Sequence, residues 1–317
     1  MSINSIQFTL DSSTMSLALS NGYASFSLEP LKKKLQHIFL NQEFGIVTNI
    51  PNSQILVCSG ISGQSPFSDK VLCIYDEQIS HVVLEIQDFS DTICNIYMWP
   101  KMFCVSTRTE VRLYTFDPPV LFCQFRTSPN AFGQCAFYCN DDQFIIAMTG
   151  RTDSMLRIVT SEPSENQDFS FECSQHGISK IVFNLDASLV ATASSIGTII
   201  RIWRTSNGEK IAEFRRGSTS AVINSMAFSP SSELLAVASN KKTLHIFDIT
   251  NKTEQRSSLT WTIPVNVQFS IAFSSDGRLL CAFKTGQLYI LDVSQKEKGV
   301  QLKQVISFGD SLDAFHV

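Results

Sequence analysis

The sequence predicts an all-β chain folded as a seven-bladed β-propeller of WD-like repeats. Short alternating apolar runs recur along the chain between Ser, Asn, Asp and Gly, and long runs with a 3.6-residue period are absent. In the C-terminal half, three similar units begin at Phe183, Phe228 and Phe273, a spacing of 45 residues. One WD-type blade of four strands has about 40 to 45 residues, so the 317 residues hold about seven blades.

Each unit of the repeat reads as an apolar strand, a polar turn, a strand of small residues, a second turn and a strand with an aromatic end. Blades that stack around an axis bury both faces of each sheet, which accounts for the nearly continuous apolar strands. The large aromatic residues of the repeat are therefore expected in the core: Phe183, Phe228, Phe273, Trp203 and Phe247. The sequence predicts one domain, residues 1–317, with blades near 4–36, 44–88, 91–127, 131–173, 178–216, 221–263 and 266–310.

Composition limits the classes of function. The net charge is −4 and only 17% of residues are charged, so binding of nucleic acid by general electrostatics is not expected. The nine cysteines form no C-x-x-C pair and are expected to be reduced, mostly buried thiols of a cytosolic protein. Neither a signal peptide nor an apolar run of about 18 residues is apparent, so membrane contact is expected to be peripheral.

Catalytic motifs are not found in the sequence. Neither the G-x-S-x-G, H-E-x-x-H and P-loop patterns nor the G-x-G-x-x-G pattern occurs. We therefore expect a binding protein rather than an enzyme, without a cofactor or a metal site. The basic run Lys32-Lys33-Lys34 has two interpretations, a solvated turn between blades one and two, which we favour, or a patch that faces lipid.

The outstanding local feature is residues 213–218, which read Glu-Phe-Arg-Arg-Gly-Ser on the expected outer strand of blade five. Successive strand residues point to opposite faces, so Arg215 and Arg216 cannot share one pocket but can serve two. Gly217 then lets the chain turn away with little steric restriction. The planar guanidinium donates paired hydrogen bonds that suit phosphate. An arginine pair on an outer strand is also a common way to discourage edge pairing, which is the plainer interpretation.

Neighbouring blades supply hydroxyl groups near the expected pockets. Ser194 and Ser239 are one period apart, as are Thr198 and Thr243, whereas blade seven has Lys284 and Leu288 at these positions. Hydroxyl groups, a glycine and a histidine are suitable partners for phosphate oxygens. The repeat therefore predicts two sites and not three.

These residues resemble the PROPPIN family, β-propellers that bind phosphatidylinositol 3-phosphate and 3,5-bisphosphate in autophagy. The similarity is carried by Phe-Arg-Arg-Gly at 214–217 and by residues 191–202, 225–230 and 243–247, with a weaker match at 70–76. The resemblance implies that a first site uses His176, Thr192, Ser194, Gly197, Thr198, Arg201 and Arg215. It implies that a second site uses Arg216, Ser239, Thr243 and His245.

The sequence departs from the family pattern in three places. Thr219 and Ser220 replace an acidic-basic pair that often follows the arginines, and Lys242 replaces a glycine that is common in blade six. The long apolar loop that often enters the bilayer is replaced by residues 251–259, which are short and polar. Leu259 and Trp261 are its only expected apolar anchors, so we expect weak membrane insertion.

Two functions follow as expectations. The first is a phosphoinositide effector, cytoplasmic and recruited peripherally to preautophagosomal or endosomal membranes, that scaffolds autophagy proteins. The resemblance implies autophagy lipid-transfer or conjugation-scaffold proteins as partners, docked around blades two and three. The second is a WD-repeat protein-interaction scaffold that binds no lipid.

Overall fold

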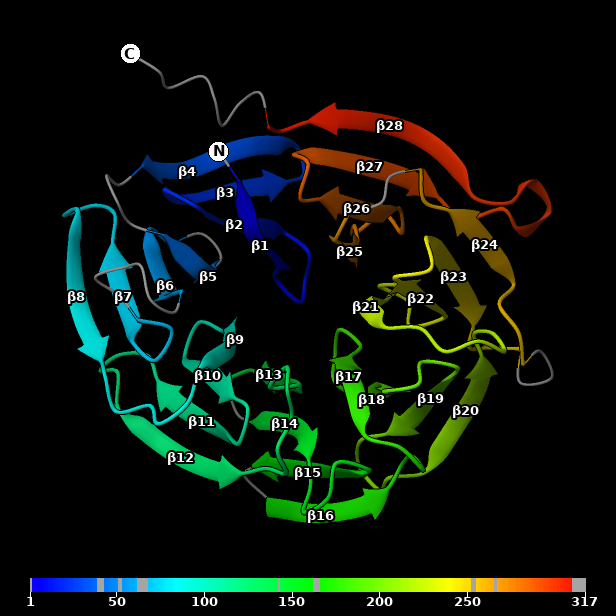
Figure 1. Ribbon diagram of the computed structural model, residues 1–317, viewed down its shortest axis with the longest axis horizontal. Coiled ribbons are helices and arrows are strands. Elements are labelled where there is room, and N and C mark those ends of the chain that lie inside the picture. The colour runs from blue at the N-terminus through cyan, green and yellow to red at the C-terminus, as the bar shows by residue number, and fades with distance from the viewer. Residues whose placement is uncertain are drawn as a thin grey trace.

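The computed structural model describes residues 2–38, 43–50, 53–61, 68–141, 143–161, 166–251, 255–264 and 267–309. Its strands form seven antiparallel four-stranded sheets arranged in a ring, as Figure 1 shows. Four consecutive strands build each sheet, which we call a blade and number from the N-terminus. The predicted seven-bladed propeller is thereby confirmed.

The first four blades occupy the N-terminal half of the chain. Their strands are β1 (Ile3–Phe8), β2 (Thr14–Leu19), β3 (Gly22–Leu28), β4 (Leu31–Ile38), β5 (Phe44–Asn49), β6 (Ile55–Gly60), β7 (Leu72–Asp76), β8 (His81–Ile86), β9 (Ile93–Met98), β10 (Met102–Thr107), β11 (Glu110–Thr115), β12 (Leu121–Arg126), β13 (Cys135–Cys139), β14 (Phe144–Thr149), β15 (Met155–Ser161) and β16 (Asn166–Glu172).

The last three blades contain the candidate site, and one 3-10 helix precedes the last strand. Their elements are β17 (Ile178–Phe183), β18 (Leu189–Ser194), β19 (Ile199–Arg204), β20 (Lys210–Arg215), β21 (Ile223–Phe228), β22 (Leu234–Ser239), β23 (Thr243–Asp248), β24 (Leu259–Thr262), β25 (Phe269–Phe273), β26 (Leu279–Phe283), β27 (Gln287–Asp292), η1 (Lys296–Lys298) and β28 (Gln301–Ser307).

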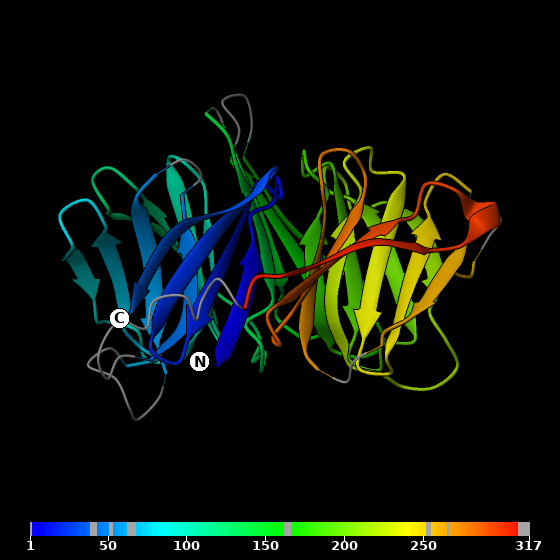
Figure 2. The same cartoon turned by 90° about the horizontal axis from the view of Figure 1, so that it is seen from above.

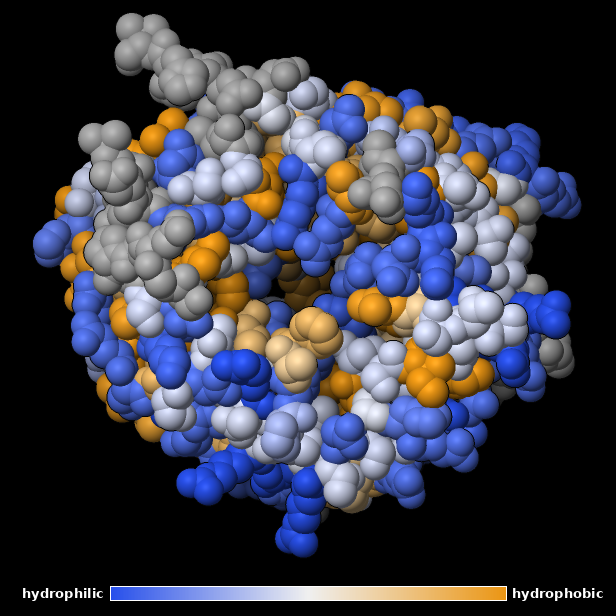
Figure 3. All heavy atoms as spheres, in the orientation of Figure 1, coloured by the Kyte–Doolittle hydropathy of each residue, from blue (hydrophilic) through white to orange (hydrophobic). Residues whose placement is uncertain are grey.

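The first strand of each blade lies nearest the axis and the fourth lies at the rim (Figure 1). Seen from the side, the blades stand next to one another around the axis (Figure 2). A space-filling view along the axis shows a hollow at the centre (Figure 3). Rim strands such as β20 are therefore the surfaces most open to large partners.

One apolar cluster lies between each pair of neighbouring blades, which gives seven clusters around the ring. The strand β14 is buried along its whole length, because blades cover both of its faces. All five aromatic residues that were predicted in the core are buried. All nine cysteines are free thiols, seven of them buried and two partly buried.

The repeat also fixes a turn. The leading residues Phe183, Phe228 and Phe273 each end the innermost strand of a blade. Four residues later the backbone turns through the left-handed region at Ala187 (φ 55°), Ser232 (φ 60°) and Gly277 (φ 81°). This shared turn explains why the period of 45 residues is visible in the sequence.

The ring is closed by side chains between blades seven and one, because each of these sheets consists only of its own four consecutive strands. An apolar cluster that includes Leu17, Leu280 and Phe308 fills this interface. Ser270 Oγ donates a hydrogen bond to the carbonyl of Ile6 at 3.0 Å, and the ammonium of Lys284 donates one to the carbonyl of Asn4. Within the described residues no strand is exchanged between the two blades, so closure there depends on packing and side-chain hydrogen bonds.

The interpretation of Lys32, Lys33 and Lys34 as a turn is wrong. The three residues lie within β4, the rim strand of blade one, and follow the bend at Pro30. Lys32 and Lys34 are exposed and Lys33 is half-buried. Lysines suit such an edge because their charge discourages pairing with another sheet.

Two kinds of feature, membrane-spanning helices and metal sites, are absent from the part of the chain that the structure describes. Within it, no helix has the length and apolar character needed to cross a membrane. Within the same ranges, no group of three or more His, Cys, Asp and Glu side chains is arranged to hold a metal ion.

Candidate functional site

The two adjacent arginines lie at the end of β20, the rim strand of blade five. Arg215 is its last residue and lies opposite Ile199, while Phe214 lies opposite Ile200. Phe214 packs against Phe247 of blade six at 4.9 Å between ring centroids. Because side chains alternate along a strand, Arg215 and Arg216 extend from opposite faces of blade five.

Arg216 is a buried cation with an exposed fraction of only 7%. Its Nε donates to the carbonyl of Gly197 at 2.6 Å and its Nη2 donates to the carbonyl of Thr219 at 2.5 Å. Among the described residues, no carboxylate lies within ion-pair distance of Arg216. Burial lowers the pKa of the guanidinium, which nevertheless remains charged at neutral pH.

The position of Arg216 is apolar in three other blades. The backbone N–H of Arg216 donates to Thr198 O, and the same connection is made by Cys173 in blade four, Ile263 in blade six and Phe308 in blade seven. Those three side chains are 3%, 2% and 1% exposed. Only blade five of these four places a charge there, and a buried charge without a counter-ion favours binding of an anion.

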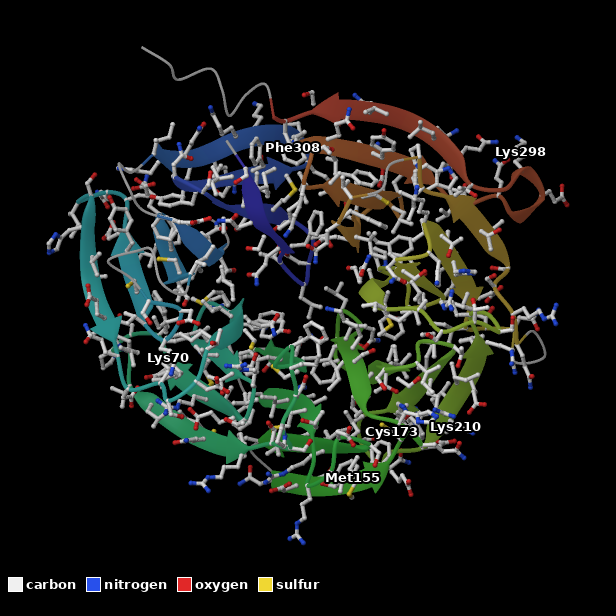
Figure 4. All side chains as sticks on the ribbon, viewed as in Figure 1. Lys70, Met155, Cys173, Lys210, Lys298 and Phe308 are labelled. Carbon is white, nitrogen blue, oxygen red and sulfur yellow. The ribbon has the colours of Figure 1, made fainter. Side chains whose placement is uncertain are left out.

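The face of blade five that carries Arg215 also carries Arg201. Arg201 lies opposite Glu213, its Nε donates to Glu213 Oε2 at 2.8 Å, and its Nη1 donates to the carbonyl of Cys173 in blade four at 3.2 Å. Lys210 adds a second contact with Glu213 Oε2 at 3.3 Å. Figure 4 shows Cys173 and Lys210 close to the junction of blades four and five.

Two of the three hydroxyl residues of the first site, Thr192 and Ser194, are buried, whereas Thr198 is half-buried. Thr192 is 3% exposed, and its Oγ accepts a hydrogen bond from the indole of Trp203 at 3.0 Å. Ser194 is buried at the end of β18, and its carbonyl accepts a hydrogen bond from Ser179 Oγ at 2.9 Å. His176 is exposed in the connection between β16 and β17, and its backbone N–H donates to Ser174 Oγ at 3.2 Å.

The structure explains why residue 197 is a glycine, which the sequence did not reveal. Its φ is 68°, and a Cβ atom there would lie 2.0 Å from the carbonyl oxygen of Ala221. The lack of a side chain thus lets the β18–β19 turn approach the start of blade six. Because the Gly197 carbonyl accepts the Arg216 Nε hydrogen bond, this turn positions the buried arginine.

Three of the four residues predicted for the second site, Ser239, Thr243 and His245, form one hydrogen-bonded group. Ser239 Oγ and Thr243 Oγ1 are 3.3 Å apart, and Thr243 Oγ1 lies 3.2 Å from His245 Nε2. The other ring nitrogen of His245 lies 3.2 Å from Ser257 Oγ. Burial and, secondly, the positive charge of Arg216 lower the pKa of His245. The charge of Arg216 therefore acts on His245 across the interface of blades five and six.

The register corrects the correspondence between the two sites. Ala193 pairs with Ile200, whereas Ala238 pairs with Leu244, so the turn in blade five is one residue longer than the turn in blade six. Thr198 therefore lies in the turn and is not the counterpart of Thr243. That counterpart is Ile199, one residue before Ile200.

By the same register, Arg201 of blade five is the counterpart of His245 of blade six. In blade seven, Phe283 pairs with Gln287 as Ser239 pairs with Thr243. Phe283 and Gln287, and not the expected Lys284 and Leu288, are therefore the counterparts of Ser239 and Thr243. Blade seven still lacks the hydroxyl pair.

The three departures from the family pattern have distinct structural outcomes. Thr219 and Ser220 are exposed, and the Thr219 carbonyl binds Arg216. Lys242 has φ 57°, so it stands in a left-handed conformation that Gly197 and Gly286 take at the matching turns of blades five and seven. Glycine is common at this position because it adopts the left-handed conformation without strain. Lys242 adopts the same conformation with a cost in backbone strain.

The expectation that Leu259 and Trp261 anchor the chain in a membrane is wrong. Both lie in β24, where Leu259 is 7% exposed and Trp261 packs against the same apolar cluster between blades six and seven. Residues 259 and 261 lie on the same face of β24, and both side chains pack into the core between blades six and seven. Residues 252–254 of this loop lie outside the described residues.

Three functional neighbours did not emerge from the sequence. Glu213 pairs with the arginine of the first site, Ser257 contacts His245, and Arg256 forms an isolated parallel bridge with Arg215. Glu213 lies two residues before Arg215 in the sequence, and its position opposite Arg201 could have been predicted from the register of the β19–β20 hairpin. The Arg256 contact joins blades six and five, and the Ser257 contact lies within blade six but depends on the loop before β24, so no local pattern predicts either.

Comparisons with known proteins agree with this geometry. SVP1-like protein 2 of Schizosaccharomyces pombe is 31% identical over 247 residues, which are 78% of this chain and 68% of that protein. Autophagy-related protein 18 of Scheffersomyces stipitis is 25% identical over 283 residues, covering 78% of this chain and 50% of that protein. The chain thus spans between about half and two thirds of the length of these relatives.

Solved structures share the fold. Kluyveromyces lactis Hsv2 superposes with a TM-score of 0.80 and 18% identity, covering 97% of this chain and 99% of that chain. A complex of KlAtg21 with the coiled-coil of AgAtg16 gives a TM-score of 0.81 at 20% identity, over 97% of this chain and 100% of that chain. The sequence model of the PROPPIN family matches residues 2–269, and with the seven blades and the arginine pair at the end of β20 this places the chain in the PROPPIN family.

Proposed function

We propose that this chain binds phosphoinositide headgroups, phosphatidylinositol 3-phosphate and 3,5-bisphosphate, on autophagic or endosomal membranes and scaffolds autophagy proteins there. One observation carries the proposal. Arg215 and Arg216 leave opposite faces of one rim strand, and Arg216 is a buried cation with no carboxylate beside it among the described residues. A phosphate group supplies the missing negative charge and accepts paired hydrogen bonds.

The two proposed pockets differ in their surroundings. The first lies on the blade-four face, where Arg215 is exposed and Arg201 is held by Glu213. The second lies on the blade-six face, where Arg216 is near His245. Two weak headgroup sites on one rim bind a membrane more tightly than either alone, because the first contact raises the effective concentration for the second.

Vesicle co-sedimentation tests the proposal. Arg215→Ala combined with Arg216→Ala is expected to abolish binding to vesicles that contain phosphatidylinositol 3-phosphate, and salt is expected to weaken binding by the unmodified chain. Arg126→Ala is a matched control. Arg126 is the exposed last residue of β12, and Thr127 after it donates to Thr109 O as Arg216 donates to Thr198 O.

Arg216 is buried, so its loss can also disturb the fold. A thermal unfolding curve of each variant separates a local defect from a global one. Arg215→Ala alone keeps the backbone contacts of β20 and is expected to unfold like the unmodified chain. If the double variant is folded and binds the vesicles like Arg126→Ala, the lipid site is not at the arginine pair.

A second candidate function is protein scaffolding. The rim strands of blades two and three expose apolar side chains, among them Val83 of β8 and Leu121 and Phe122 of β12. Large exposed apolar side chains on neighbouring rim strands favour a protein contact. The KlAtg21 complex shows that a propeller of this fold binds a coiled-coil. Val83→Asp with Phe122→Asp is expected to abolish binding of an autophagy coiled-coil and to preserve vesicle binding.

A further inference from the structure

The segment 255–257 crosses from blade six to the rim of blade five. The carbonyl of Gln255 accepts the backbone N–H of Arg215 at 2.7 Å. Arg215 and Arg256 form an isolated parallel bridge, the only one recorded outside the strands of the described chain. The loop that precedes β24 therefore extends the sheet of blade five by one short contact at the arginine pair.

This contact places two cations on one face. Residues paired directly in a sheet direct their side chains to the same face, and like charges in that position destabilise the pair. Both Arg215 and Arg256 are exposed. Within the described residues, neither has a carboxylate within ion-pair distance. The arrangement lacks a counter-ion that a phosphate group would provide.

The segment is held at both of its ends. On one side Gln255 binds the backbone of Arg215, and on the other Ser257 Oγ lies 3.2 Å from His245 Nδ1. Ser258 then donates its N–H and its Oγ to the carbonyl of Ile246 at 2.9 and 3.0 Å. The residues on both sides of Arg256 are thus held beside the arginine pair, which lowers the entropy lost when Arg256 binds a ligand.

We propose that Arg256 is a third phosphate-binding residue, which shares with Arg215 a phosphomonoester of the lipid headgroup. This inference rests on the proposed function and adds a residue and a mode of contact to it. The short loop then contributes to membrane binding through charge, since Leu259 is buried and cannot enter the bilayer.

Affinity for three probes tests the inference. The probes are vesicles with phosphatidylinositol 3-phosphate, vesicles with phosphatidylserine as the only anionic lipid, and soluble inositol 1,3-bisphosphate. Arg256→Ala is expected to weaken binding to the first and the third probe roughly ten-fold, the loss of about one charge-assisted hydrogen bond. Arg256→Lys is expected to recover part of this loss, because it restores the charge without the planar fork.

A second readout does not involve membranes. At low salt, Arg256→Ala is expected to raise the melting temperature slightly, because it removes the repulsion from Arg215. Inositol 1,3-bisphosphate is expected to raise the melting temperature of the unmodified chain more than that of Arg256→Ala.

The outcomes distinguish a role of Arg256 in binding from phosphoinositide binding by the arginine pair. If Arg256→Ala binds all three probes like the Arg126→Ala control while Arg215→Ala with Arg216→Ala loses binding, Arg256 is not a ligand and the proposed function stands. If only the phosphatidylserine vesicles respond to Arg256→Ala, the residue contacts general anionic lipid and the shared phosphomonoester is wrong. If neither variant changes any binding, the proposed function fails as well.

Discussion

The guanidinium of Arg201 is held 2.8 Å from the carboxylate of Glu213, the residue directly opposite it on β20. Burial by itself raises the pKa of Glu213, but Arg201 and Lys210 outweigh this effect and leave the pKa below its usual value. The carboxylate is therefore ionised at neutral pH. A phosphate that enters the first pocket must compete with it for Arg201.

Glu213→Gln is expected to strengthen binding of phosphoinositide vesicles by roughly three- to ten-fold, because Arg201 then lacks a competing anion. Folding stability is expected to change by less than about 1 kcal/mol, since the ion pair is partly exposed. Glu209→Gln is the matched control, because Glu209 pairs with Arg204 at 3.0 Å at the other end of the same hairpin. Weaker binding by Glu213→Gln would instead assign Glu213 to positioning Arg201.

The pH dependence of binding tests the second pocket. Burial and Arg216 lower the pKa of His245 below 6.5, so the free protein holds a neutral imidazole at pH 7. A bound phosphate favours the charged imidazole, so binding is coupled to uptake of a proton. The affinity for phosphate therefore rises as the pH falls. Because the pKa is lowered, this gain is expected mainly below pH 6.5.

The comparison uses His245→Gln, because the phosphomonoester itself titrates near pH 6. The ratio of the affinities of the unmodified chain and the variant is expected to rise several-fold from pH 7.5 to 5.5, measured by vesicle co-sedimentation at fixed salt. Parallel profiles for the two proteins would exclude contact between His245 and phosphate.

Gly217 follows the arginine pair without a conformational need for glycine. Its φ is outside the left-handed region, and a Cβ atom there would meet nothing within 4 Å. Gly217→Ala is therefore expected to leave the free energy of unfolding unchanged or to raise it by about 0.5 kcal/mol. If the headgroup approaches the backbone here, vesicle binding falls several-fold, whereas unchanged binding would place the ligand elsewhere. Gly197→Ala is expected to unfold the site, because its Cβ would collide with Ala221 O.

Lys242 combines backbone strain with a charge near the second pocket. Lys242→Gly is expected to raise the free energy of unfolding by about 0.5 to 1 kcal/mol in urea titrations, because glycine adopts its φ of 57° without strain. Lys241→Gly, one residue earlier, is expected to lower stability. A lower stability of Lys242→Gly would show that its side chain makes a contact that outweighs the strain.

The fold could be predicted from the sequence because its repeat is carried by turns as well as strands. Phe183, Phe228 and Phe273 end the inner strands, and the left-handed residue four positions later keeps their spacing constant. The lengths of the second turns could not be predicted in this way. Residue 198 is inserted after the left-handed Gly197, and only the observed strand pairing shows that Ile199 rather than Thr198 corresponds to Thr243.

The candidate site was predictable where it depends on strand alternation. The opposite faces of Arg215 and Arg216 follow from the period of two residues. Arg256 contacts blade five and Ser257 contacts His245 within blade six, and both contacts depend on the path of the loop before β24 in three dimensions. The burial of Leu259 depends on the register of β24, which the polar residues before it conceal.

Lys180 is a half-buried cation that lines the central cavity of about 240 Å³ between the inner strands. Burial lowers its pKa to about 8, and no charged neighbour contributes to this shift. Since the pKa in the unfolded chain is near 10.5, the unfolded state binds more protons between pH 8 and 10.5. Stability is therefore expected to rise with pH through this window.

Lys180→Met keeps a long side chain and removes the charge. It is expected to raise the free energy of unfolding at pH 7 by roughly 1 to 3 kcal/mol, in proportion to the lowered pKa of Lys180. The gain is expected to shrink between pH 8 and 10.5, where the unmodified chain loses the charge of Lys180. Urea titrations of both proteins at pH 7 and 9.5 measure the difference, which cancels the titration of other groups. A gain that is equal at the two pH values would show that packing, and not charge, limits stability at this position.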